Sequence, residues 1–152
     1  GLFAAVTAMH LRDEGGPMPE AMVLLYPNTD LRPDRPFASL KSESGHVMTE
    51  ESLAYENGLF VPDIAARSDP IVSPLLATDL SRLPRALVVT AEHDPLRDEG
   101  EAYARRLEEA GVAVEVRRFE DQIHGFLNMT GAGRTPRAAV VEIAHRLEAG
   151  LA

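Results

Sequence analysis

The chain has 152 residues with an ordinary share of hydrophobic (45%) and charged (26%) side chains, which fits one globular domain. Its formal net charge of −9 argues against nucleic acid and anionic membrane surfaces as partners, because both attract basic protein faces. No apolar run approaches the ~20 residues of a membrane span, and the lack of cysteine excludes disulfides and thiolate chemistry. A cytoplasmic location is the default expectation.

The first predicted element is a helix over residues 1–14, which a Gly-Gly-Pro segment closes. Its buried face should contain Leu2, Val6 and Met9, which recur at helical spacing. No Ser, Thr, Asp or Asn caps its apolar start, so we expect a helix cut from a longer chain, with a frayed natural terminus as the alternative. A buried strand should follow over residues 21–26.

Residues 28–85 show no clear strand and contain six prolines. A short helix is predicted at about 49–57 with Thr49 as its cap. Ser52 stands at the third helical position, where a full capping box would have Glu or Gln. Insertions of this length between strands are usually functional, for example as a lid or a pocket wall. A plain surface excursion is the alternative, and the residues alone do not decide between the two.

The second half of the chain alternates strands and helices. Its predicted elements, in order, are a strand at 86–90, a helix at 97–110 and a strand at 112–120. A last helix should be capped at Thr135-Pro136 and bury Val140, Ile143 and Leu147. The order of elements predicts the α/β class, with three parallel strands and flanking helices.

Two side chains with chemical potential stand where adjacent strands end. Asp94 follows the strand at 86–90, and His124 follows the strand at 112–120. The carboxyl ends of parallel strands gather ligands and catalytic groups. Each residue also has a plain alternative, an Asx turn before proline for Asp94 and a loop histidine for His124. Together they supply two parts of a hydrolytic triad, in which the acid orients the histidine and the histidine carries the proton.

Metal binding is the rival chemistry. His93, Asp94, Asp98 and Glu99 lie close together, but these four residues lack the His-x-x-x-His or Glu-x-x-His spacing of helical metal sites. Three further histidines stand alone and should be solvated or lie on helix surfaces: His10, His46 and His145. The sequence contains no glycine-rich phosphate loop.

Three motifs occur in a recognisable order, Ser73-Pro74-Leu75, then Asp94 to Gly100 (DPLRDEG), then His124-Gly125-Phe126. In sequence and spacing they closely resemble α/β-hydrolases of the hormone-sensitive-lipase-like esterase family. The resemblance implies that Asp94 is the triad acid and His124 the base, with Asp98 and Asp121 as rival acids. It also implies that the helix at 1–14 follows a nucleophile elbow, and that residues 28–85 help to wall the acyl pocket.

The family's His-Gly-Gly-Gly oxyanion segment and its Gly-Asp-Ser-Ala-Gly elbow are both missing from this sequence. Ser42 and Ser44 lack the elbow's first glycine and its strand-to-helix setting, so we reject both as nucleophile. We therefore expect residues 1–152 to be a single partial domain, the C-terminal half of an α/β-hydrolase fold without its nucleophile-bearing N-terminal half.

The resemblance implies a parent carboxylic-ester hydrolase, an esterase or lipase, that uses a Ser-His-Asp triad with no metal and no organic cofactor. Short-to-medium acyl esters are the expected substrates, and this chain alone should be inactive. The alternative is a non-enzymatic α/β module or interaction fragment. The expected partners are a small acyl-ester substrate and the missing half of the fold. Since no lysine protects residues 22–25, we also expect self-association through that strand.

Overall fold

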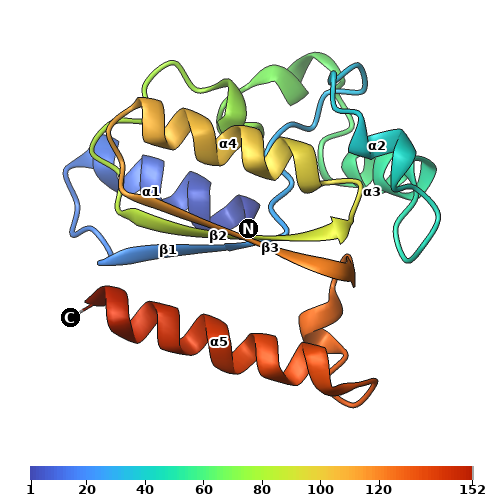
Figure 1. Ribbon diagram of the computed structural model, residues 1–152. Coiled ribbons are helices and arrows are strands. Elements are labelled where there is room, and N and C mark those ends of the chain that lie inside the picture. The colour runs from blue at the N-terminus through green and yellow to red at the C-terminus, as the bar shows by residue number, and fades with distance from the viewer. Residues whose placement is uncertain (152) are drawn as a thin grey trace.

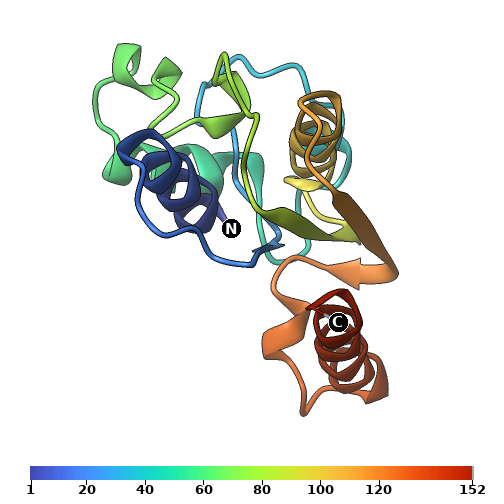
Figure 2. The same cartoon turned by 90° about the vertical axis from the view of Figure 1, so that its left-hand side faces the viewer.

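Three parallel strands form the centre of the computed structural model, which describes residues 1–151 (Figure 1). The strands are β1 (Ala21–Leu25), β2 (Arg85–His93) and β3 (Val114–Ile123), in the order β1-β2-β3. Helices α1 (Leu2–Glu14) and α4 (Arg97–Glu109) cover one face of the sheet, and α5 (Arg134–Leu151) covers the other (Figure 2). The predicted α/β class with three parallel strands and flanking helices is confirmed.

Strand β2 is the buried centre of the sheet, since it pairs with a strand on each side. Its side chains alternate between two apolar clusters. Val88 packs with residues of α1 and α4, whereas Leu87 and Val89 pack with residues of α5. β1 pairs with β2 only as far as Val89, but β3 continues to pair with it, so β2 extends to His93, beyond the predicted end at residue 90.

Strand β3 contains an irregularity near its end. Ala91 of β2 lies opposite Phe119, but His93 lies opposite Ile123, so β3 uses four steps where β2 uses two. Within this stretch Asp121 has a φ of 56°, a backbone conformation that is uncommon outside glycine and typical of a bulge. The consequence is that the residue after β3, His124, comes level with the residue after β2, Asp94.

The buried face of α1 differs from the predicted one. Met9 is buried as expected, but Leu2 and Val6 are only half-buried, and Ala5 and Ala8 are the side chains that lie in the core. Alanine carries no bulk beyond its methyl group, which lets a helix approach a sheet closely. Hydrophobic periodicity therefore predicted the helix correctly. The side chains that face the core, however, lie about one residue along the helix from the predicted ones.

Helix α5 also departs from the prediction at two points. It begins at Arg134, so Thr135 lies inside the first turn and does not cap the helix. Val140 is 43% exposed, and Ala139 takes the inner position beside Ile143. The inner stripe is set by contact with Leu87, Val89 and their neighbours on the sheet, which a helical pattern alone does not specify.

Residues 28–84 contain only helices and irregular chain in the described structure, and residue 85 already begins β2. These helices are α2 (Ser39–Ser42), α3 (Glu50–Phe60), η1 (Ala65–Ser68) and η2 (Pro74–Leu76). At α3 the expectation of an incomplete cap is wrong. The Thr49 hydroxyl accepts the Ser52 N–H at 2.9 Å, and the Thr49 N–H donates to the Ser52 hydroxyl at 3.0 Å, so serine completes the capping box.

None of the helices within residues 1–151 is both long and apolar enough to cross a membrane.

The first turn of α4 holds the 28–85 region against the sheet. The Ser39 hydroxyl donates to the Pro95 carbonyl at 2.9 Å, and the Ser39 N–H donates to Asp98 Oδ2 at 2.8 Å. The Asp98 N–H in turn donates to the Ser39 hydroxyl at 3.1 Å. Ser39 is fully buried, so these bonds form where water does not compete for them.

Glu99, the next residue of α4, is fully buried and makes the deepest of these contacts. Its Oε1 accepts the Thr29 N–H at 2.7 Å and the Asp30 N–H at 3.4 Å. Its Oε2 lies 3.3 Å from Nε of the buried Arg35, an ion pair that is not aligned as a hydrogen bond. The Arg35 guanidinium also donates to the Asp30 carbonyl. One carboxylate thus fixes the chain directly after β1.

Burial raises the pKa of Glu99 to about 8, while the Arg35 charge and the Thr29 and Asp30 amides act in the opposite direction. An unfolded glutamate binds a proton only below about 4.3. Between these two values the folded chain holds more protons than the unfolded chain. The free energy of unfolding should therefore fall as the pH rises from about 5 through 8.

We expect urea unfolding from pH 5 to pH 8.5 to show this decline in the wild-type chain. Glu99→Gln should lose that part of the slope, because glutamine does not titrate. Glu108→Gln removes the same charge from an exposed position on α4 and should keep the wild-type slope. Equal slopes in all three proteins would mean that Glu99 is ionised in the folded chain over the whole range.

Candidate active site

The structure brings Asp94 and His124 into direct contact at the carboxyl edge of the sheet. His124 Nδ1 lies 2.8 Å from Asp94 Oδ2. Asp94 is 1% exposed, and the His124 side chain is 22% exposed. A carboxylate removed from water and bonded to an imidazole orients the ring and stabilises its charged form.

Asp94 also forms the Asx turn that its position before proline predicted. Its Oδ1 accepts the Leu96 N–H at 2.8 Å, and its carbonyl accepts the Arg97 N–H at 3.0 Å. The two carboxylate oxygens therefore have separate partners, one in the turn and one in the imidazole. The turn does not compete with the contact to His124 but holds the carboxylate in place for it.

Tyr26 packs against the His124 ring, and no pattern in the sequence identified it as a site residue. The two rings lie 5.0 Å apart between centroids, and the Tyr26 hydroxyl accepts the Leu127 N–H at 2.9 Å. Burial raises the pKa of Tyr26 to about 12, so the phenol stays neutral at ordinary pH. Tyr26 has a φ of 43°, which is costly for a bulky residue and is typical of a functional position.

The turn that carries His124 rests on aromatic packing. Gly125 has a φ of 75°, a left-handed conformation that glycine adopts without a steric cost. The turn then buries Phe126, whose ring lies 5.2 Å from Phe119 and 5.7 Å from Tyr26 between centroids. Phe126 therefore anchors one side of the His124 turn, while Asp94 fixes the imidazole on the other.

His124 opens onto a hollow of about 330 Å³. Its walls come from the first turn of α1, the end of β1, the region of residues 28–85 and the turn before α4. The lining side chains are mostly apolar and include Leu2, Leu25, Met48, Leu53 and Leu96. No serine is among the residues that line the hollow within the described chain.

The two rival acids lie elsewhere. Asp98 accepts the Ser39 N–H and, at 2.9 Å through Oδ1, the Arg97 guanidinium. Asp121 is exposed, and its N–H donates to Glu92. Among the described residues the carboxylate that contacts the His124 imidazole is that of Asp94.

The rejected serines and the metal candidates are also engaged in other contacts. The Ser42 hydroxyl donates to Glu43, and the Ser44 hydroxyl accepts the Glu50 N–H. Of the four residues weighed as a rival metal site, Asp94, Asp98 and Glu99 contact the partners already described. His93 turns to a different group, Glu43 and His46.

Comparison with known proteins extends the likeness over most of the chain. A family model described as alpha/beta hydrolase fold matches residues 1–128. The carboxylic ester hydrolase LipN of Mycobacterium tuberculosis is 38% identical over 156 residues, covering 99% of this chain and 41% of that protein. An arylesterase of Saccharolobus solfataricus is 49% identical over 85 residues, covering 56% of this chain and 27% of that protein.

A solved structure has the same fold over nearly the whole chain. The hyperthermophilic esterase from the archaeon Pyrobaculum calidifontis superposes with a TM-score of 0.91 at 38% identity, covering 97% of this chain and 49% of that one. The chain thus spans about two fifths of LipN and about half of this esterase.

Proposed function

This chain belongs to the α/β-hydrolase family, and on that premise we propose that the whole protein to which it belongs hydrolyses carboxylic esters. The observation that carries the proposal is the 2.8 Å contact between the buried Asp94 and His124, beside a hollow with apolar side chains in its wall. The similar proteins named as ester hydrolases support the same reaction class.

In the proposed mechanism Asp94 is the triad acid and His124 the base. The Nδ1–H of His124 donates to Asp94 Oδ2, which leaves Nε2 as the proton acceptor toward the hollow. A serine in a part of the whole protein that this chain does not contain would attack the ester carbonyl and pass its proton to Nε2. His124 then protonates the leaving alcohol, and the cycle repeats with water on the acyl-enzyme.

The hollow favours an apolar acyl group. Met48 and Leu53 belong to the 28–85 region, and Leu96 lies two residues after Asp94 in its turn, so the region and the Asp94 turn share one apolar surface. We propose that residues 28–85 wall the acyl site and that short-to-medium acyl esters are the substrates. The proposed steps need neither a metal nor an organic cofactor, and the cytoplasm remains the proposed location.

The chain of 152 residues should not release p-nitrophenol from p-nitrophenyl butyrate above a serum-albumin control. The reason is that no serine lines the hollow beside His124 among the described residues. A serine-directed organophosphate should leave the chain unlabelled. Turnover together with stoichiometric labelling would reveal a nucleophile within these residues and contradict the proposed division of the triad.

In the whole protein His124→Ala should abolish most turnover. Asp94→Asn should lower kcat by roughly 10⁴-fold, the loss known when a triad acid becomes an amide. Asp121→Asn, at an exposed position, is the matched control and should keep near wild-type kcat and KM. Should Asp98→Asn or Asp121→Asn cripple kcat while Asp94→Asn leaves it intact, the assignment of the acid is wrong.

We further propose that the outer edge of β1 is a pairing surface. Within residues 1–151 β1 pairs with β2 alone, so its second row of backbone N–H and C=O groups has no strand partner. The strand is apolar, with Met22 and Leu24 buried and Val23 half-buried on the other face. A free apolar edge favours either another copy of the chain or the remainder of the hydrolase fold.

The isolated chain should self-associate, and its sedimentation coefficient should rise over a concentration series. Val23→Lys should weaken this association, because a lysine at an edge opposes strand pairing without placing a charge in the core. Val140→Lys, on the exposed side of α5, is the control for an added charge. A stable monomer at high concentration in all three proteins would rule out an accessible edge.

A further inference from the structure

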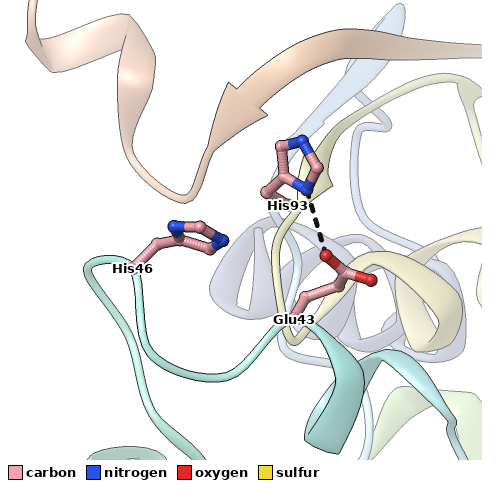
Figure 3. A group of neighbouring side chains, drawn as sticks. All are labelled: Glu43, His46 and His93. Carbon is pink, nitrogen blue, oxygen red and sulfur yellow. Dashed lines mark hydrogen bonds and ion pairs between the residues drawn. The ribbon is translucent and has the colours of Figure 1, made fainter.

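Three side chains from two distant segments converge outside the Asp94–His124 pair. Glu43 and His46 belong to the turn after α2, and His93 is the last residue of β2 (Figure 3). One donor atom from each lies within 4.8 Å of the donor atoms of the other two. His93 Nδ1 is 3.1 Å from Glu43 Oε2, and the two imidazole centroids are 5.4 Å apart.

The local chain explains how the turn presents its two ligands. Gly45, between Glu43 and His46, has a φ of 120°, which side-chain-bearing residues rarely adopt. The Gly45 N–H donates to the Met48 carbonyl at 3.1 Å, which closes the turn. Glu43 and His46 are three residues apart, a Glu-x-x-His spacing that here lies in a turn and not on a helix.

We propose that Glu43, His46 and His93 bind a divalent transition-metal ion, with Zn²⁺ as the best-matched ion. Two imidazoles and one carboxylate are a known protein ligand set for zinc, with water in the fourth position. Imidazole ligands favour zinc and its neighbours over magnesium and calcium, which prefer sites made of oxygen alone. The site is separate from the proposed ester chemistry and does not depend on it.

The distances suit a tetrahedral ion. Zinc binds nitrogen and oxygen ligands at about 2.0–2.2 Å, so neighbouring ligand atoms in a tetrahedron lie roughly 3.4 Å apart. The His93–Glu43 separation of 3.1 Å already meets this condition. His46 is exposed, so its side chain has room to complete the group. Closing the remaining gap from at most 4.8 Å requires a side-chain rotation and no movement of the sheet.

Arg97 contacts Glu43 on the side away from His93. Glu43 Oε1 lies 3.5 Å from the Arg97 guanidinium, while Oε2 faces His93. A metal on Oε2 can keep the Arg97 contact as an outer-shell interaction that orients the carboxylate. An ordinary Glu43–His93 ion pair would account for two of the three side chains, but it gives no reason for the position of His46.

A second group shares His93 and makes the competing site. Glu92, His93 and Asp121 also have donor atoms within 4.8 Å of one another. This group offers one imidazole and two carboxylates, and Glu92 Oε2 already accepts the Asp121 N–H at 2.8 Å. The His93–Glu92 distance is 4.0 Å, longer than the His93–Glu43 distance. The first group is therefore the better zinc site.

The metal would stiffen one wall of the hollow. His93 directly precedes Asp94, and Met48, two residues after His46, lines the hollow. An ion bound across Glu43, His46 and His93 would join the 43–48 turn to the end of β2. Zinc would then act as a structural clamp beside the site.

The test is calorimetric titration of the tag-free chain with ZnCl₂ in a buffer that does not chelate. We expect one zinc per chain. His46→Ala and Glu43→Gln should each weaken binding at least tenfold, and each folded variant is checked by circular dichroism. His10→Ala disrupts the exposed His10–Glu14 pair, which is 3.4 Å apart, and should leave zinc affinity unchanged. Co²⁺ in place of zinc should give the visible absorption of a tetrahedral site in the wild type and in His10→Ala, and should not give it in His46→Ala or Glu43→Gln.

Two results would overturn the proposal. Equal zinc affinity in the wild type and His46→Ala would mean that His46 binds no metal and that Glu43 and His93 form only an ion pair. A loss of binding in Asp121→Asn, with His46→Ala unaffected, would move the site to the competing group. Neither result bears on ester hydrolysis, so the fate of this proposal and that of the proposed function are decided by different measurements.

Discussion

The buried carboxylate of Glu99 is the contact on which the arrangement of this chain depends. It accepts the backbone N–H groups that follow β1, and the buried Arg35 guanidinium lies beside it. Without this carboxyl group those buried N–H groups would lack a partner, and an unsatisfied buried donor costs about 1–3 kcal/mol. The chain after β1 is therefore bound to the first turn of α4, and the wall of the hollow is bound with it.

Four side chains within residues 94–99 contact distant parts of the chain. Asp94 meets the exit of β3, Arg97 meets Glu43, Asp98 meets Ser39, and Glu99 meets the chain after β1. Each of these partners lies at least 30 residues away in sequence. A motif that looks like a single signature in the sequence is, in the structure, a junction between the sheet, the 28–85 region and the hollow.

The sequence was sufficient for features that depend on local pattern. Apolar runs located all three strands, and the residues after two of them, Asp94 and His124, are those that the structure brings together. The sequence did not predict the features that are set by contact between distant segments. The position of Tyr26 under His124 and that of His46 beside His93 depend on pairing that no periodicity expresses. The inner face of α5 depends in the same way on the sheet beneath it.

The irregularity in β3 has a consequence for how this arrangement could be lost. With the spacing that pairs Ala91 with Phe119, the residue level with Asp94 would be Gln122; the two extra residues of β3 put His124 there instead. The bulge is thus a length adjustment that aligns acid and base. Regular pairing of β3 to its end would keep every residue of the chain, yet carry His124 past Asp94 by about two strand residues, or roughly 6–7 Å. A change of strand register alone would accordingly separate acid and base, with each signature residue still present.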